Sequence, residues 1–103
     1  MARALVGTVF ELPDGAQKVV ELGRDDVLVV HTGGKFYAIN NICSHADFEL
    51  EGGPVEDRKI KCVHHGSCFD LETGAALNLP AVRPVKTYRT IVEDGKVFVE
   101  THE

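Results

Sequence analysis

The stretch CVHHGSCFD, residues 62–70, decides the fold, because it places two cysteines and two histidines within nine positions. The whole chain of 103 residues contains three cysteines and five histidines. The third cysteine belongs to an upstream motif, Cys43-Ser44-His45, and sixteen residues separate the two motifs. Thiolates and imidazoles are favoured ligands of iron, zinc and copper. The two motifs therefore predict a metal centre built from two loops that converge in space.

The size and charge of the chain limit the classes of protein to which it can belong. A chain of this length predicts one domain, residues 1–103, with one modest core. Hydrophobic residues make up 44% and charged residues 26%, as in ordinary globular proteins. The net charge is −5, and no stretch gathers the basic residues of a nucleic-acid-binding surface. The acidic balance instead favours solubility or a protein partner with a basic surface.

No segment has the pattern of a targeting or membrane-spanning sequence. The start of the chain lacks an apolar run of signal-peptide length, and no stretch approaches the roughly 20 apolar residues of a membrane-spanning helix. We therefore expect a cytoplasmic protein without membrane attachment, in a compartment where thiols stay reduced. Three cysteines near histidines in that compartment predict metal ligands rather than disulfides.

The apolar residues outside the two motifs follow the short rhythm of β-strands. Runs bounded by Gly, Pro or Asp occur at residues 5–10, 19–22, 27–30, 36–39, 88–92 and 97–99. The pair Gly33-Gly34 and the segment Glu93-Asp94-Gly95-Lys96 are typical of hairpin turns, since Gly accepts positive φ. No long stretch has helical periodicity. The pattern predicts an all-β antiparallel sandwich or small barrel of about seven to ten strands.

The middle of the chain, from Asn40 to about Pro84, has the composition of loops. So much irregular chain in a small domain needs something to hold it in place, and the two metal-ligand motifs lie within it. Cys43-x-His45 and Cys62-x2-His65 each supply one sulfur and one nitrogen. That mixed order matches zinc fingers poorly, because they usually pair cysteine with cysteine and histidine with histidine. It suits a Rieske centre, in which two thiolates bind one iron and two imidazoles bind the other.

At this level of detail the chain resembles the Rieske [2Fe-2S] ferredoxins that serve bacterial multicomponent aromatic-ring-hydroxylating dioxygenases. The resemblance covers nearly the whole chain and is carried by these motifs: Cys43-x-His45, Cys62-x2-His65-Gly66-Ser67-x-Phe69-Asp70, Thr73-Gly74, Leu79-Pro80-Ala81, Pro84-Val85-Lys86-Thr87-Tyr88 and the hairpin at 92–97. It implies a β-sandwich base, a loop-rich cluster-binding subdomain at about 41–84, and a proline loop near Pro80 that covers the cluster. It also implies that one [2Fe-2S] cluster is bound by Cys43 and Cys62 on the inner iron and by His45 and His65 on the outer iron.

The resemblance implies an electron carrier rather than an enzyme. Family members that oxidise substrates carry a second domain with a mononuclear iron, for which this chain has no counterpart. We expect a monomer that takes electrons from an NAD(P)H-dependent flavoprotein reductase and passes them to a terminal oxygenase. Two alternatives stay open: the small subunit of an assimilatory nitrite reductase, which often lacks the ligands, and a redox-silent module in which the same four residues bind zinc.

The residues around the ligands have simpler expected roles. We interpret His64 as a loop residue, Cys68 as a small buried hydrophobic residue in a strand, and Gly52-Gly53-Pro54 as a plain turn. His31 and His102 have no pattern beyond ordinary surface or strand positions. The exposed edge of the cluster, with Asp47, Glu49, Pro80 and Arg83 nearby, is the expected docking surface.

The resemblance also bears on the reduction potential. High-potential relatives have a disulfide between the loops, at the positions of Phe48 and His64, and a tyrosine at the position of Phe69 whose hydroxyl bonds a ligand sulfur. Gly66 would allow close backbone approach. Ser67 matches a position whose hydroxyl bonds a bridging sulfide in part of the family. Two features absent against one present favour the low end of the Rieske range, near about −150 mV rather than +300 mV.

Overall fold

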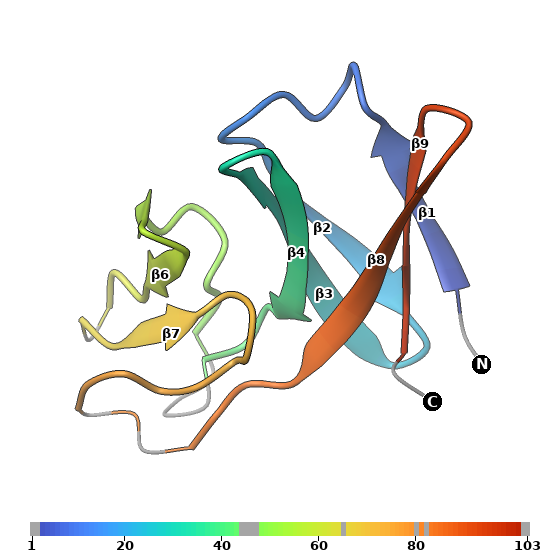
Figure 1. Ribbon diagram of the computed structural model, residues 1–103. Helices are drawn as coiled ribbons and strands as arrows, with labels where there is room; N and C mark the ends of the chain where they lie inside the picture. The colour runs from blue at the N-terminus through green and yellow to red at the C-terminus, as the bar shows by residue number, and fades with distance from the viewer. Residues whose placement is uncertain (1–2, 44–47, 65, 80, 82, 102–103) are drawn as a thin grey trace.

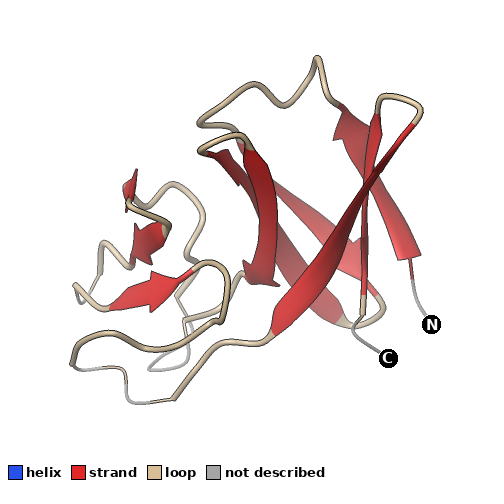
Figure 2. Cartoon of the chain, viewed as in Figure 1, coloured by secondary structure: helices blue, strands red, loops and turns tan. Residues whose placement is uncertain are grey.

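The computed structural model describes residues 3–43, 48–64, 66–79, 81 and 83–101. Its strands are β1 (Arg3–Thr8), β2 (Gln17–Leu22), β3 (Asp25–Thr32), β4 (Lys35–Asn40), β5 (Val55–Glu56), β6 (Lys59–Lys61), β7 (Cys68–Asp70), β8 (Thr87–Glu93) and β9 (Lys96–Glu100). Within the described ranges there is no helix, as Figure 2 shows, so none of them contains a helix that could cross a membrane. The prediction of an all-β fold is confirmed.

Six strands form a curved antiparallel sheet in the order β1-β9-β8-β4-β3-β2 (Figure 1). Its two edge strands approach each other, since the Lys18 Nζ of β2 donates a hydrogen bond of 2.7 Å to the Val6 carbonyl oxygen of β1. The sheet is joined by the expected hairpins. Gly33 and Gly34, with φ of 59° and 79°, turn between β3 and β4, and Asp94-Gly95 turns between β8 and β9.

The first strand is shorter than the sequence predicts. The apolar run at residues 5–10 suggests one strand, but β1 ends at Thr8 after a register shift between Leu5 and Gly7. The backbone N–H of Glu11 then donates to the Thr8 carbonyl oxygen at 3.1 Å and turns the chain away from the sheet. Phe10 is consequently 92% exposed.

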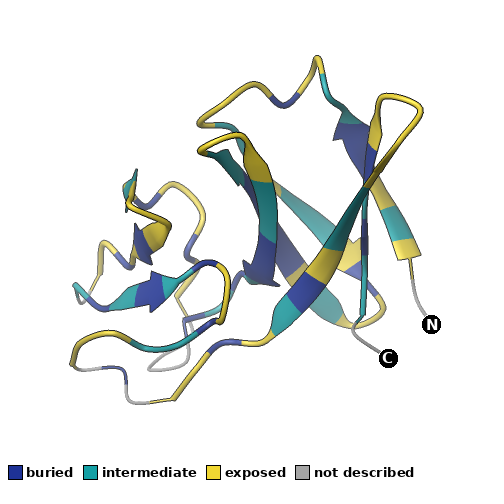
Figure 3. Ribbon diagram, in the orientation of Figure 1, coloured by how far each residue is buried: buried dark blue, intermediate teal, exposed yellow. Residues whose placement is uncertain are grey.

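Strand β3 is apolar on both faces because it separates two cores. Leu28 and Val30 pack into one core, together with Ile39 of β4, while Val27 and Val29 pack into the other. A strand buried on both faces has a continuous apolar run rather than alternation, which explains the sequence at 27–30. Figure 3 shows the buried positions along these inner strands.

A second, three-stranded sheet, β5-β6-β7, lies in the connection between β4 and β8, beside β4 in Figure 1. Ile60 of β6 and Phe69 of β7 are paired and fully buried in the core that they share with β3 and β4. Cys68 alternates with Phe69 and is half-buried, so the expectation of a buried Cys68 is wrong. The inward position on this strand belongs to Phe69.

The segment that leads into the small sheet is held to the large sheet by polar side chains. Gln17 of β2 donates from Nε2 to the Gly53 carbonyl oxygen at 2.9 Å and accepts the Gly52 N–H at 2.8 Å. The buried Asn41 accepts the Glu51 N–H at 3.0 Å. A Cβ on Gly53 would lie 2.1 Å from the Lys61 carbonyl oxygen, so this position requires glycine. The turn that we expected is present, since the Gly53 N–H donates to the Leu50 carbonyl oxygen at 3.1 Å, and the glycine pair is in addition part of the junction.

A second polar junction lies where β4 leaves the large sheet and β8 returns to it. The Tyr88 hydroxyl donates to Asp25 Oδ2 at 2.7 Å and accepts from Asn40 Nδ2 at 3.2 Å. Burial and the hydrogen bond to Asp25 raise the pKa of Tyr88 to about 12. The same hydrogen bond, together with Lys86 at 3.3 Å, lowers the pKa of Asp25. The network ties both ends of the connecting segment to the rim of β3.

Candidate metal centre

The two cysteine motifs form loops that are closed in the same way. The Cys43 N–H donates to the Phe48 carbonyl oxygen at 2.8 Å, and the Cys62 N–H donates to the Ser67 carbonyl oxygen at 2.7 Å. In each loop the bond runs from the cysteine to the fifth residue after it. The second loop is further tightened by the Gly66 N–H, which donates to the Cys62 carbonyl oxygen at 2.7 Å.

Gly66 is required for its backbone conformation. Its φ is 78°, in the left-handed region, whereas a Cβ would meet only an ordinary contact with the Lys61 side chain at 3.8 Å. The close approach of this backbone to the cluster stays a prediction.

Cys43 and Cys62 are buried to 2% and 0% exposure and pack in the same core. Neither forms a disulfide. The other two predicted ligands, His45 and His65, lie outside the described residues. Among the residues that the structure does describe, no group of three or more His, Cys, Asp or Glu side chains could hold a metal ion. Cys43 and Cys62 thus share one buried region, and the assignment of all four residues as ligands stays a prediction.

Ser67 is a buried polar residue next to the second loop closure. It is 0% exposed, and its Oγ accepts the backbone N–H of Ala81 at 3.1 Å. Among the described residues, this bond uses only the oxygen of the hydroxyl. Because buried donors are nearly always paired, the hydroxyl proton is available to an acceptor in the site. A sulfide or thiolate sulfur is an acceptor of that kind.

The loop that contains the predicted cluster-covering Pro80 is tied to the second cysteine loop on both sides of the proline. Pro80 itself lies outside the described residues. Before it, Asn78 donates from Nδ2 to the Gly66 carbonyl oxygen at 3.1 Å and accepts the Cys68 N–H at 2.5 Å. After it, the Ala81 N–H bonds Ser67. Asn78 could not be predicted from the sequence, because its partners are backbone groups about ten residues away in the chain.

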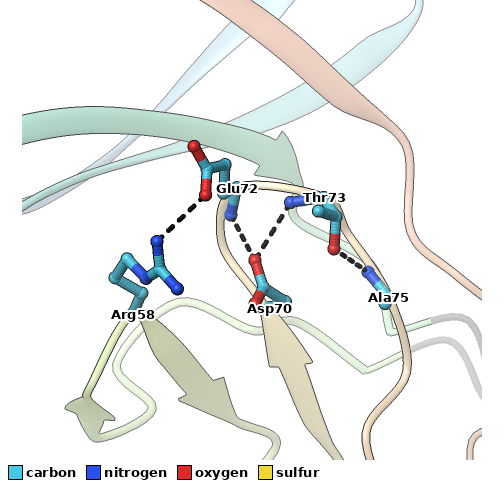
Figure 4. Close-up of polar contacts among 5 residues, drawn as sticks. All are labelled: Arg58, Asp70, Glu72, Thr73 and Ala75. Atoms are coloured by element: carbon cyan, nitrogen blue, oxygen red, sulfur yellow. Dashed lines mark hydrogen bonds and ion pairs between the residues drawn. The ribbon is translucent and has the colours of Figure 1, made fainter.

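A carboxylate organises the turn that follows β7 (Figure 4). Asp70 Oδ1 accepts the backbone N–H groups of Thr73 at 3.0 Å and Glu72 at 2.8 Å, and Arg58 pairs with Glu72 at 3.0 Å. The hydrogen bonds from Thr73 and Glu72 lower the pKa of Asp70, and the positive charge of Arg58 contributes. The turn ends at Gly74, where a Cβ would lie 2.1 Å from the Val85 carbonyl oxygen. Asp70 therefore fixes the chain that leads from the second ligand loop back to the core.

His64 and Phe48 contact each other across the site. Their rings are stacked, with centroids 4.3 Å apart and an angle of 20° between the planes. His64 is exposed, in agreement with its interpretation as a loop residue, but the stack shows that it has a specific partner. His31 likewise has specific contacts: Leu12 at 2.7 Å and a stack on Phe36. His102 and Asp47 lie outside the described residues, whereas Glu49 and Arg83 are exposed.

Residues 2–89 match the family model described as the Rieske [2Fe-2S] domain. The chain is 39% identical over 104 residues to the 3-phenylpropionate/cinnamic acid dioxygenase ferredoxin subunit of Photorhabdus laumondii, with 100% of this chain and 98% of that protein covered. Its structure is similar to the ferredoxin of carbazole 1,9a-dioxygenase from Nocardioides aromaticivorans IC177, with a TM-score of 0.91, 34% identity and coverage of 98% and 99% of the two chains. It is also similar to a chain in a complex of reduced oxygenase and oxidised ferredoxin in carbazole 1,9a-dioxygenase, with a TM-score of 0.88, 26% identity and coverage of 94% and 91%.

The chain belongs to the Rieske [2Fe-2S] family, and the resemblance inferred from its motifs is confirmed. It carries one Rieske [2Fe-2S] cluster. The described part of the site fits that group, because two buried thiols without a disulfide and a buried hydroxyl lie on loops closed by their own backbone. The expectation of an electron-transfer component rather than an enzyme also agrees with the relatives, which are named as ferredoxin subunits.

Proposed function

We propose that this chain is the ferredoxin subunit of an aromatic-ring dioxygenase system, with Cys43 and Cys62 binding the inner iron and His45 and His65 the outer iron. When bound, the cluster accepts and returns one electron. The observation that carries the proposal is the pair of buried, unlinked cysteines on two equivalently closed loops. The spacing of the two histidines relative to these cysteines supplies the rest of the ligand set.

The protein residues create the environment in which the electron is held. Burial of Cys43 and Cys62 keeps water away from the thiolates, and short loop closures hold the two cysteines in fixed positions. With the cluster bound, the Ser67 hydroxyl would donate to a sulfur and stabilise the negative charge added there. Two neutral imidazoles in place of two thiolates reduce the negative charge of the site, so the addition of an electron is more favourable.

The proposed partners are a terminal oxygenase and an NAD(P)H-dependent flavoprotein reductase. A similar chain occurs in a complex of oxygenase and ferredoxin, which supports the oxygenase as electron acceptor. The reductase follows from the need for an electron donor that converts hydride into single electrons. We place the protein in the cytoplasm, where thiols stay reduced, and we expect it to be a monomer. The similar ferredoxins are named for dioxygenases of cinnamic acid and carbazole, which are aromatic compounds, and this suggests an aromatic substrate for the oxygenase.

The test of the ligand assignment begins with the purified protein. We expect a red-brown colour and two irons and two acid-labile sulfides per chain. A colourless protein that contains zinc would support the redox-silent alternative. The variants His45→Ala and His65→Ala should lose the Rieske spectrum, whereas His64→Ala, the matched control in the same loop, should keep it. A His65→Ala variant with an unchanged visible spectrum would contradict the assignment.

The test of the electron-transfer role uses defined components. With a flavoprotein reductase, NADH and a terminal oxygenase, hydroxylation of the aromatic substrate should require this protein. The product formed should rise with its concentration until saturation. Hydroxylation at the same rate without the protein would contradict the role, even if the cluster assignment is correct.

A further inference from the structure

The two ligand loops each have their own closure, which raises the question of what holds one loop against the other. Phe48 lies at the closing position of the first loop, since its carbonyl oxygen accepts the Cys43 N–H at 2.8 Å. His64 lies inside the second loop, between Cys62 and Gly66, whose backbone groups are bonded at 2.7 Å. The side chains of both residues thus project from backbone that is already fixed relative to a cysteine.

The contact between these two side chains bridges the loops. Their ring centroids are 4.3 Å apart and the planes are within 20° of parallel, a geometry that aromatic rings adopt when they stack. Phe48 keeps 39% of its surface exposed, so the ring is not simply part of the core. The contact with the facing loop therefore covers part of a ring that the core does not bury.

We propose that Phe48 and His64 form an aromatic clasp that joins the two ligand loops and maintains the spacing of the residues that hold the cluster. The inference rests on the ligand assignment proposed above. Each clasp residue is a positioning residue: Phe48 acts on the loop that contains Cys43 and His45, and His64 on the loop that contains Cys62 and His65. Opening of the site requires the loops to part, and parting breaks the stack. The clasp therefore slows loss of the cluster.

The experiment removes the ring from one side of the clasp. Phe48→Leu keeps an apolar side chain but abolishes stacking, Phe48→Tyr keeps the ring, and Phe10→Leu makes the same substitution at a residue that is 92% exposed and lies outside both ligand loops. Each purified holoprotein is mixed with an iron chelator, and the loss of visible absorption is followed over time. Since an aromatic pair contributes about 0.5–1.5 kcal/mol, Phe48→Leu should lose its cluster roughly 2- to 12-fold faster than the wild type. Phe48→Tyr and Phe10→Leu should match the wild type.

Two further measurements separate positioning from general weakening of the fold. The electron paramagnetic resonance spectrum of the reduced cluster reports ligand geometry, so Phe48→Leu should broaden its lines while Phe48→Tyr restores them. In a double-mutant cycle, His64→Leu added to Phe48→Leu should cause little further acceleration, because the stack is already lost.

Wild-type rates and spectra for Phe48→Leu, additive effects of the two leucine variants, or Phe48→Tyr behaving like Phe48→Leu would each overturn the clasp. Failure of the ligand assignment has a different signature. It would appear as wild-type protein without two irons and two sulfides per chain, before any chelator is added.

Discussion

Replacement of Ser67 by alanine separates the structural function of its hydroxyl from its electronic function. The side chain is fully buried, and its oxygen accepts the Ala81 N–H at 3.1 Å. Ser67→Ala leaves that N–H without its partner, and an unsatisfied buried donor costs about 1–3 kcal/mol. We expect the free energy of unfolding to fall by roughly that amount, because removal of one oxygen atom leaves little cavity.

The reduction potential should fall in the same variant. A hydrogen bond to a charged group is worth about 1.5–3 kcal/mol, and 1.36 kcal/mol corresponds to roughly 59 mV for one electron, which sets an upper limit of about 65–130 mV. The oxidised cluster also accepts the bond, so only part of this energy distinguishes the two redox states. If that part is about half, the Ser67→Ala potential lies roughly 30–65 mV below the wild-type value.

Protein-film voltammetry at neutral pH measures the potential, and denaturant unfolding measures the stability. Thr101→Val is the control, since Thr101 Oγ1 is buried and has no hydrogen-bond partner among the described residues; this variant should leave the potential unchanged and should not lower the free energy of unfolding. A Ser67→Ala protein with reduced stability and an unchanged potential would refute the hydrogen bond to sulfur while leaving the bond to Ala81 in place. A wild-type potential well above zero would refute the expected low-potential class.

Three other predictions concern the polar contacts that hold the site. Asn78→Ala removes the bonds to Gly66 and Cys68 and should lower the free energy of unfolding by about 1–2 kcal/mol in denaturant titrations, with faster cluster loss in chelator. The pKa of Asp70 is lowered, so its stabilising contribution is present above the unfolded pKa of about 3.9 and is lost as pH falls through the lower folded pKa. Asp70→Asn should therefore flatten the acid limb of a plot of unfolding free energy against pH. An unchanged acid limb would contradict this. Because the pKa of Tyr88 is raised to about 12, its contribution to stability is complete below about pH 10 and is lost as pH rises through the folded pKa. Tyr88→Phe should remove this loss of stability at alkaline pH. Absorbance at the tyrosinate band measures the titration of the hydroxyl.

The regular part of the fold was predictable because its signals are local. The turns at Gly33-Gly34 and Asp94-Gly95 need positive φ, and glycine in the sequence indicates that need directly. The two-sided burial of β3 is likewise visible as an uninterrupted apolar run. The ligand motifs were recognisable because metal chemistry restricts both the residue types and their spacing.

The features that the sequence did not predict are those that depend on tertiary contacts. The apolar run at residues 5–10 does not reveal that the chain turns after Thr8 and exposes Phe10. The pattern of β7 does not reveal whether Cys68 or Phe69 faces the core, because the choice depends on the partner strand and on β3 behind it. Gly53 resembles any turn glycine until the Lys61 carbonyl oxygen is placed against it. Each of these features depends on residues distant in sequence.

The second sheet is too small to create its own core, so the positions of the cysteine loops must depend on contacts with the large sheet. Its strands have two, three and three residues, and isolated hairpins of that size are marginal in water. Ile60 and Phe69 instead pack on Leu28 and Val30, so the outer face of β3 serves as the floor of the cluster-binding region. The position of the cysteine loops is consequently set by the large sheet, and the short polar contacts above that floor adjust the loops relative to one another.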